Sequence, residues 1–163
     1  MKKADLAWIG GLMTGDGSLY MVKNRPKGNH SPHYQIQMGI VSTEADVIEK
    51  VHEIMQHGYV QTRQTKSCRS GTVYRWVSTS AEMLPNLKQL LPYLIGRKRK
   101  IAEVLISFQE TMQKIHQRRM NEKRSKGQYR ILPPEEIERR EKVYLEIRKL
   151  NDLASAKNNQ EVK

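Results

Sequence analysis

A single carboxylate stands at a position in this chain where its charge is unfavourable without a counter-ion. Asp16 lies between Gly15 and Gly17, at the predicted C-terminal end of an N-terminal helix. Because the C-terminus of a helix already carries partial negative charge, an aspartate there raises the electrostatic energy. A bound divalent cation would relieve the conflict, with Asp16 and the carbonyl oxygen of Gly15 as ligands. The alternative is a simple turn, since aspartate before glycine is common in turns.

The helix that carries Asp16 is predicted over residues 4–18, ADLAWIGGLMTGDGS. Its apolar residues recur at helical spacing: Leu6, Ile9, Leu12 and Met13. Gly10 and Gly11 lie in the middle, where each glycine costs about 1 kcal/mol relative to alanine. The pair therefore predicts that another backbone approaches the helix closely. Gly15 and Gly17 predict a left-handed stop and a sharp turn into a strand.

Residues 9–17, IGGLMTGDG, resemble the LAGLIDADG motif of homing endonucleases position by position, with Thr14 where an acid is usual. Three later segments resemble other parts of the same family in the right order: residues 38–43, 58–60 and 91–98. The resemblance covers nearly all of residues 4–112. A phosphate-binding loop and an EF-hand are other interpretations of the glycines and the acid, but the further residues that define each motif are missing.

The composition favours a nucleic-acid partner. The 163 residues include 29 Lys or Arg and 17 Asp or Glu, which gives a net charge of +12. Nucleic acid is preferred over an anionic membrane, because no basic amphipathic anchor or lipidation signal is evident. No apolar run approaches membrane-spanning length, and the start MKKADLAW does not resemble a cleavable secretory signal. The single Cys68 excludes an internal disulfide and fits a reducing compartment.

The order of predicted elements gives the fold class. After the first helix we expect strands over residues 19–25 and 33–41, a helix over 42–57, strands over 59–66 and 72–79, and a helix over 81–91. Hairpin connections make the four-stranded sheet antiparallel, with helices on one face. This α+β order, αββαββα, resembles the LAGLIDADG fold, in which the sheet forms a DNA-binding saddle. We expect a core domain over residues 1–112 and a basic helical C-terminal extension over 113–163.

One face of the sheet is predicted to contact DNA, although a solvated surface is the ordinary alternative. Alternation turns Ile36, Met38 and Ile40 to one side, and the outward residues are Tyr20, Val22, Asn24, Gln35, Gln37 and Gln61. Glutamine and asparagine can pair bidentately with adenine. Basic residues around this face would hold phosphates: Lys23, Arg25, Lys27, Arg63, Lys66, Arg69, Arg75 and Lys100. Alternation leaves open whether Tyr74 and Trp76, or Arg75 and Val77, face the core.

His30 and His33 form an H-x-x-H pair in the loop between the first two strands. A metal site would need further histidine or cysteine ligands, and none lies at a finger-like spacing. We therefore interpret both histidines as DNA-contacting loop residues.

The family resemblance implies an assembly and a reaction. A chain with one motif would form a C2 homodimer through the motif helix, with contacts from Leu6, Ile9, Gly10, Gly11 and Met13. The dimer would make metal-dependent staggered cuts in double-stranded DNA at a long pseudo-palindromic target, as in intron homing, and leave short 3′ overhangs. Asp16 and Gly15 would bind Mg²⁺. Mn²⁺ is a plausible substitute, and Ca²⁺ would bind without supporting turnover.

Three residues would complete the active site implied by the resemblance. Lys98 or Arg97 would be the active-site cation, and two ways of counting the motif leave that choice open. Lysine fits better, because its pKa can shift on burial whereas arginine stays charged. Ser42 would place solvent.

Two other classes of protein stay open. The first is a non-cleaving relative, either an RNA-binding intron maturase or a DNA-binding regulator on the same fold. The second is a basic ribosome-associated domain, which explains the charge but not the paired glycines. An organelle, either chloroplast or mitochondrion, a phage and a bacterial cytoplasm are all compatible settings.

Overall fold

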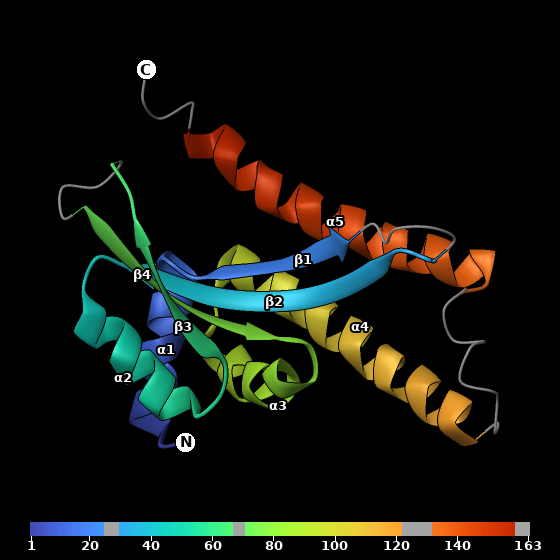
Figure 1. Ribbon diagram of the computed structural model, residues 1–163, viewed down its shortest axis with the longest axis horizontal. Coiled ribbons are helices and arrows are strands. Elements are labelled where there is room, and N and C mark those ends of the chain that lie inside the picture. The colour runs from blue at the N-terminus through green and yellow to red at the C-terminus, as the bar shows by residue number, and fades with distance from the viewer. Residues whose placement is uncertain (25–29, 67–70, 122–131, 159–163) are drawn as a thin grey trace. The chain divides into compact units, whose positions relative to one another are not determined.

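The computed structural model describes residues 1–24, 30–66, 71–121 and 132–158 of the chain. The elements follow the order α1 (Lys3–Gly15), β1 (Ser18–Asn24), β2 (His33–Ser42), α2 (Ala45–Met55), β3 (Tyr59–Gln64), β4 (Thr72–Thr79), α3 (Ser80–Leu90), the short 3₁₀ helix η1 (Leu91–Tyr93), α4 (Gly96–Asn121) and α5 (Pro134–Asn158) (Figure 1).

The strands form one sheet in the order β1-β2-β4-β3, and β4 runs antiparallel to both β2 and β3. The predicted α+β fold, αββαββα with a four-stranded antiparallel sheet and further C-terminal helices, is confirmed. Each predicted strand is present with boundaries that differ by at most two residues.

The chain divides into two compact units rather than at one point in the sequence. Unit 1 comprises Met1–Leu19 and Gln37–Glu103, and unit 2 comprises Tyr20–Ile36 and Val104–Lys163. The outer part of the β1–β2 hairpin thus belongs with the C-terminal helices. The expected division into a core domain over residues 1–112 and a helical extension over 113–163, packed on the same domain, stays a prediction.

Unit 1 is built around the inner face of the sheet. Helix α1 packs against α3 and η1, while α2 packs against β3 and β4, and α3 packs against β4. The fully buried residues that join these elements include Ile9, Met13, Ile40, Ile48, Val51, Trp76, Leu87 and Leu94. Burial of these side chains is the main stabilising contribution in this unit.

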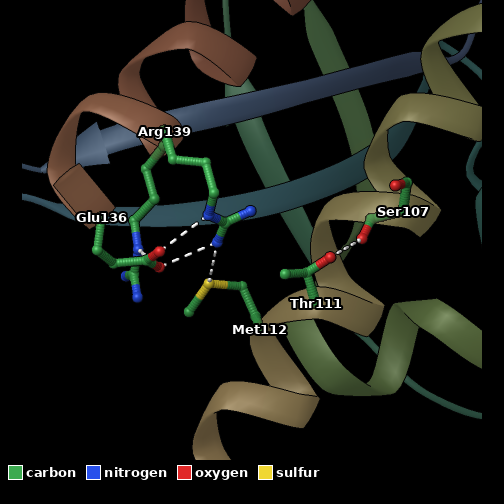
Figure 2. A network of polar contacts seen from close by, with 6 residues as sticks. Ser107, Thr111, Met112, Glu136 and Arg139 are labelled. Carbon is green, nitrogen blue, oxygen red and sulfur yellow. Dashed lines mark hydrogen bonds and ion pairs between the residues drawn. The ribbon is translucent and has the colours of Figure 1, made fainter.

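Unit 2 has its own core and a buried ion pair. Its buried residues include Tyr34, Ile36, Leu105, Phe108, Leu132 and Ile147. Figure 2 shows Glu136 held by Arg139, whose Nε and Nη2 donate over 2.8 and 2.9 Å, while Arg139 also contacts Met112 on α4. Arg140, which is only 5% exposed, donates to the same carboxylate over 2.7 Å. Burial alone would raise the pKa of Glu136, but the guanidinium donors outweigh it and hold that pKa below its usual value.

A half-buried histidine joins three elements of unit 1. The indole of Trp76 donates to the carbonyl of His57 over 2.9 Å. The imidazole Nδ1 lies 2.9 Å from the hydroxyl of Ser78, which is fully buried, and the amide of Asn86 contacts Nε2. Because an amide nitrogen can only donate, Nε2 accepts and Nδ1 carries the proton. The neutral form of His57 is therefore the one that satisfies this network.

We expect His57 to make stability depend on pH. Burial lowers the pKa of His57 from its ordinary value of 6.5, with the charge of Glu82 opposing and that of His52 assisting the shift. Below pH 6.5 the unfolded chain binds a proton at His57 more readily than the folded chain does. The free energy of unfolding therefore has its full value above pH 6.5 and decreases as the pH falls below it. Urea unfolding at pH 7.5 and 5.0 measures this loss. The His57→Gln variant should show a smaller loss, and equal losses in both proteins would contradict the assignment.

Candidate active site and nucleic-acid interface

The turn after α1 places Asp16 at the exposed end of the helix. The backbone N–H groups of Asp16 and Gly17 both donate to the carbonyl of Leu12, over 2.8 and 2.9 Å. A Cβ on Gly17 would lie 2.5 Å from Cα of Met13, so this position requires glycine for close approach. The predicted left-handed stop is wrong, because neither Gly15 nor Gly17 has a positive φ and Asp16 itself is right-handed at φ −103°. The chain therefore leaves α1 with Asp16 in the right-handed region and with two successive N–H groups bonded to the carbonyl of Leu12.

The residues at this helix end suit a hard divalent cation. Gly15 and Asp16 are both exposed, and carboxylate and carbonyl oxygens are the ligands that Mg²⁺ and Ca²⁺ prefer. Over the described residues, no group of three or more histidine, cysteine, aspartate or glutamate side chains could hold a metal ion.

Lys98 reaches the same turn. Its Nζ donates to the carbonyl of Gly17, the residue after Asp16. Burial lowers the pKa of Lys98, and the neighbouring charge of Arg97 adds to the shift. Of the two candidates for the active-site cation, Lys98 is the one with this contact, and its lowered pKa is the property that arginine lacks. Lys100 is exposed on the same helix.

Thr14 and Ser42, which differ from the residues usual at these positions in the family, make local hydrogen bonds. The hydroxyl of Thr14 donates to the carbonyl of Gly10 over 2.8 Å, within the helix. The hydroxyl oxygen of Ser42 accepts from the backbone N–H of Glu44 over 3.0 Å, at the approach to α2. The role of Ser42 in placing solvent stays a prediction beside this turn contact.

The two central glycines of α1 lie in different surroundings. A Cβ on Gly10 would lie 2.5 Å from Cβ of Tyr93 and 3.1 Å from its carbonyl oxygen, whereas a Cβ on Gly11 would meet nothing within 4 Å. The predicted close approach of another backbone is confirmed at Gly10, and that backbone is the chain's own η1. Gly11 faces outward.

The expected dimer contact stays a prediction, and its five residues differ in burial. Leu6, Ile9, Gly10 and Met13 are buried within their own chain, and of the five expected residues only Gly11 is exposed. The apolar stripe that periodicity identifies is the face that packs against α3 and η1. The opposite, exposed face of α1 consists of Ala4, Ala7, Trp8, Gly11 and Gly15.

The register of β4 places several expected DNA-binding residues on one face within unit 1. Trp76 pairs with Ile40 and is fully buried, so it faces the core, while Arg75 lies on the other face. Arg75 stands opposite Gln61 on β3, and Arg63 stands opposite the next outward residue of β4. Gln37 has the same parity on β2. These four polar residues share the outward face of the sheet.

The remaining expected DNA-binding residues are placed individually. Tyr20, Val22 and Asn24 alternate with buried Leu19 and Met21 along β1, and Gln35 lies between buried residues of β2. His30, His33 and Lys66, which follows β3, are exposed. Arg25, Lys27 and Arg69 lie outside the described residues. Lys23 was expected to hold a phosphate, but its Nζ instead pairs with Glu141 over 2.7 Å.

No helix within the described ranges is long and apolar enough to cross a membrane.

Comparison with known proteins identifies the fold. No protein-family profile and no curated protein matches the chain. The homing endonuclease I-CvuI, in complex with the I-CreI target and Mg, aligns with a TM-score of 0.56 and 19% identity over 66% of this chain and 67% of that chain. The LAGLIDADG homing endonuclease I-SmaMI bound to cleaved DNA aligns with a TM-score of 0.60 and 17% identity over 85% of this chain and 42% of that chain.

The archaeal intron-encoded homing endonuclease I-Vdi141I, complexed with DNA, aligns over most of both chains. Its TM-score is 0.51 and its identity 14%, over 93% of this chain and 99% of that chain. The chain therefore has the LAGLIDADG homing endonuclease fold, as the motif in α1 indicated.

The two glycines predict opposite effects of alanine on stability. Gly10→Ala should destabilise the chain by about 1–3 kcal/mol, because Tyr93 must move. Gly11→Ala should be neutral or stabilising by up to about 1 kcal/mol, because alanine is the better helix former. Urea unfolding at several protein concentrations separates chain stability from association. Equal destabilisation by both variants would contradict the packing of α1.

Proposed function

We propose that this protein is a site-specific DNA endonuclease that acts as a homodimer and uses a divalent metal ion. The observation that carries the proposal is the contact of Lys98, an amine of lowered pKa, with the turn that presents Asp16. Support comes from the fold, which this chain shares with structures of homing endonucleases bound to DNA.

The homodimer supplies the second carboxylate that one chain lacks. Along α1, Ala7, Gly11 and Gly15 recur every four residues on the exposed face, and small residues at this spacing let two helices approach closely. Contact at Gly15 brings the Asp16 side chains of both copies together, because Asp16 is the next residue. The Asp16 carboxylates and Gly15 carbonyls would hold Mg²⁺, with Mn²⁺ as a substitute and Ca²⁺ as a binding competitor.

The bound metal ion would supply a water of lowered pKa and neutralise charge on the leaving oxygen. Lys98 stabilises negative charge that develops on the scissile phosphate, and its lowered pKa also lets it exchange a proton near neutral pH more readily than an ordinary lysine. Its hydrogen bond to Gly17 keeps the amine oriented toward the turn.

The outward face of the sheet reads the target. Gln37 and Gln61 offer amides that match adenine, and the guanidinium groups of Arg63 and Arg75 match guanine or phosphate. Because a C2 dimer presents this face twice, the preferred target is pseudo-palindromic.

The first test is cleavage of a library of partly randomised DNA duplexes, incubated with the protein in Mg²⁺ and separately in Ca²⁺. Sequencing of cut and bound molecules should reveal one long pseudo-palindromic target that is cut in Mg²⁺ and bound but uncut in Ca²⁺. Specific binding with no cut in either ion would favour the non-cleaving regulator. Binding of folded intron RNA in preference to duplex DNA would favour the maturase.

The roles of the site residues predict a separation of cleavage from binding. Asp16→Asn and Lys98→Met should each lower the single-turnover cleavage rate at least about 100-fold, the usual cost of removing one preorganised electrostatic group. The affinity for target DNA in Ca²⁺ should change much less. Arg97→Met is the matched control, with a cleavage rate within about tenfold of wild type. A larger loss for Arg97→Met than for Lys98→Met would reassign the active-site cation.

A leucine on the exposed face of α1 should abolish the dimer without unfolding the chain. A larger side chain at Gly11 has room in its own chain but separates the two helices. Sedimentation velocity should show Gly11→Leu as a monomer without double-strand cleavage. Glu49→Leu, which adds an exposed leucine on α2, should remain dimeric and active. A dimeric, active Gly11→Leu variant would place the interface elsewhere.

A further inference from the structure

Within unit 2, one carboxylate of α5 is bound to both strands of the β1–β2 hairpin. Glu141 pairs with Nζ of Lys23 on β1 over 2.7 Å and accepts the hydroxyl hydrogen of Tyr34 on β2. Tyr34 is only 5% exposed. Burial raises the pKa of Tyr34, and the adjacent Glu141 carboxylate raises it further, so the phenol keeps the proton that it donates.

Two aromatic rings lie beside this ion pair. The Nζ of Lys23 lies 5.8 Å from the ring centroid of Tyr34 and 5.9 Å from that of Tyr144, which is also on α5. The two rings meet edge to face, 6.1 Å apart. Cation–π contacts of this kind add to the attraction of the ion pair, which stays partly exposed. Glu141, Lys23, Tyr34 and Tyr144 form one polar–aromatic cluster, which we call the hairpin clamp.

A second contact ties the hairpin to the same helix. The backbone N–H of Leu132, just before α5, donates to the hydroxyl of Ser31, just before β2, over 2.7 Å. Arg140, the residue next to Glu141, is buried and pairs with Glu136 of the same helix, and Arg139 contacts Met112 on α4. Helix α5 and the segment just before it therefore contact the hairpin at Lys23, Ser31 and Tyr34.

The hairpin clamp acts from behind the face that would contact DNA. Neighbouring residues of a strand point to opposite faces, so Lys23 points away from the face that Val22 and Asn24 present. Tyr34 likewise points away from the face of Gln35. A two-stranded hairpin is marginally stable alone, and base reading needs side chains held within about 0.5 Å of the productive geometry.

We propose that Glu141 is a positioning residue for DNA recognition: through Lys23 and Tyr34 it holds the β1–β2 hairpin in the conformation that reads bases. The inference rests on the proposed function and extends it, since it assigns to a residue far from Asp16 in sequence a part in specificity and none in cleavage chemistry. Glu141 itself does not touch DNA. Its effect is confined to the target positions that the hairpin reads.

The test compares specificity profiles. The wild type and three variants, Glu141→Ala, Glu141→Gln and Glu138→Ala, are each assayed for cleavage of single-base-pair variants of the target. Glu138→Ala is the matched control, because Glu138 is an exposed glutamate of the same helix. Two reference variants define which positions each part reads: Gln35→Ala for the hairpin and Gln61→Ala for β3. Hydrogen exchange of residues 20–24 and 33–36 gives a readout that does not need activity.

Glu141→Ala should lower the preference for the correct base pair over the wrong ones about tenfold at the target positions that Gln35→Ala affects. The base preference at the positions that Gln61→Ala affects, and the cleavage rate on saturating target, should not change. Hairpin amides should exchange faster, while those of β4 do not. Glu141→Gln keeps an acceptor for Tyr34 but loses the charge that pairs with Lys23, so its effect should be intermediate.

Two results would overturn the inference alone: an unchanged profile for Glu141→Ala, or an equal loss at all positions that follows the loss of thermal stability. Wild-type protein that neither binds nor cuts any duplex would overturn the proposed function and this inference together. The wild-type profile therefore distinguishes the two failures.

Discussion

The close packing of α1 against Tyr93 at Gly10 constrains the rest of the candidate site. Gly10 and Gly17 are seven positions apart, which is about 10 Å along a helix, and the segment from Tyr93 to Lys98 has a contact at both of them. One end of this segment contacts Gly10 and the other donates the Lys98 hydrogen bond to Gly17. Gly96, with a φ of 56°, turns the chain between them into α4. The same short segment thus packs against α1 at Gly10 and places the Lys98 amine at the turn after it.

Electrostatics explain why a cation sits at this turn. The C-terminus of α1 carries partial negative charge, and Asp16 adds a full one. Lys98 offsets part of this charge by donating to a carbonyl of the turn, and its burial lowers the pKa that it would otherwise have. The carboxylate of Asp16 stays exposed. The half-buried amine of Lys98 and the exposed carboxylate of Asp16 have complementary roles, because the first is hydrogen-bonded to the chain while the second can receive a ligand from solution.

Sequence patterns predicted the features that depend on local periodicity. The element order, the inward side of β2 and the close approach at one central glycine all follow from alternation, helical spacing and the cost of glycine in a helix. Features that depend on pairing between distant segments did not follow. The pairing of Trp76 with Ile40 determines which residues of β4 face the core. Lys23 forms an ion pair with Glu141, which lies more than a hundred residues later in the sequence.

The proposed dimer contact shows a different limit of sequence reasoning. Periodicity finds an apolar stripe on α1, but a helix that is packed on one side and docked on the other needs two faces. The second face carries the small residues Ala7, Gly11 and Gly15 instead of large apolar ones. In the sequence it can be recognised by small residues at every fourth position and not by hydrophobicity. Gly10 and Gly11 are adjacent in sequence, yet about 100° apart around the helix, and only the surroundings tell them apart.

The exposed small face has a consequence for how activity depends on assembly. In the proposed site each chain contributes the Asp16 carboxylate at the end of α1, and the described residues contain no group of three or more histidine, cysteine, aspartate or glutamate side chains that could hold a metal ion. If two copies meet through this face, the metal site and the symmetric reading surface form in the same step. Cleavage is then confined to sites where both half-targets are bound, since a lone chain lacks the second acid. Such a requirement suits a protein with a net charge of +12, because nonspecific attraction to DNA is strong while damage at nonspecific sites is limited.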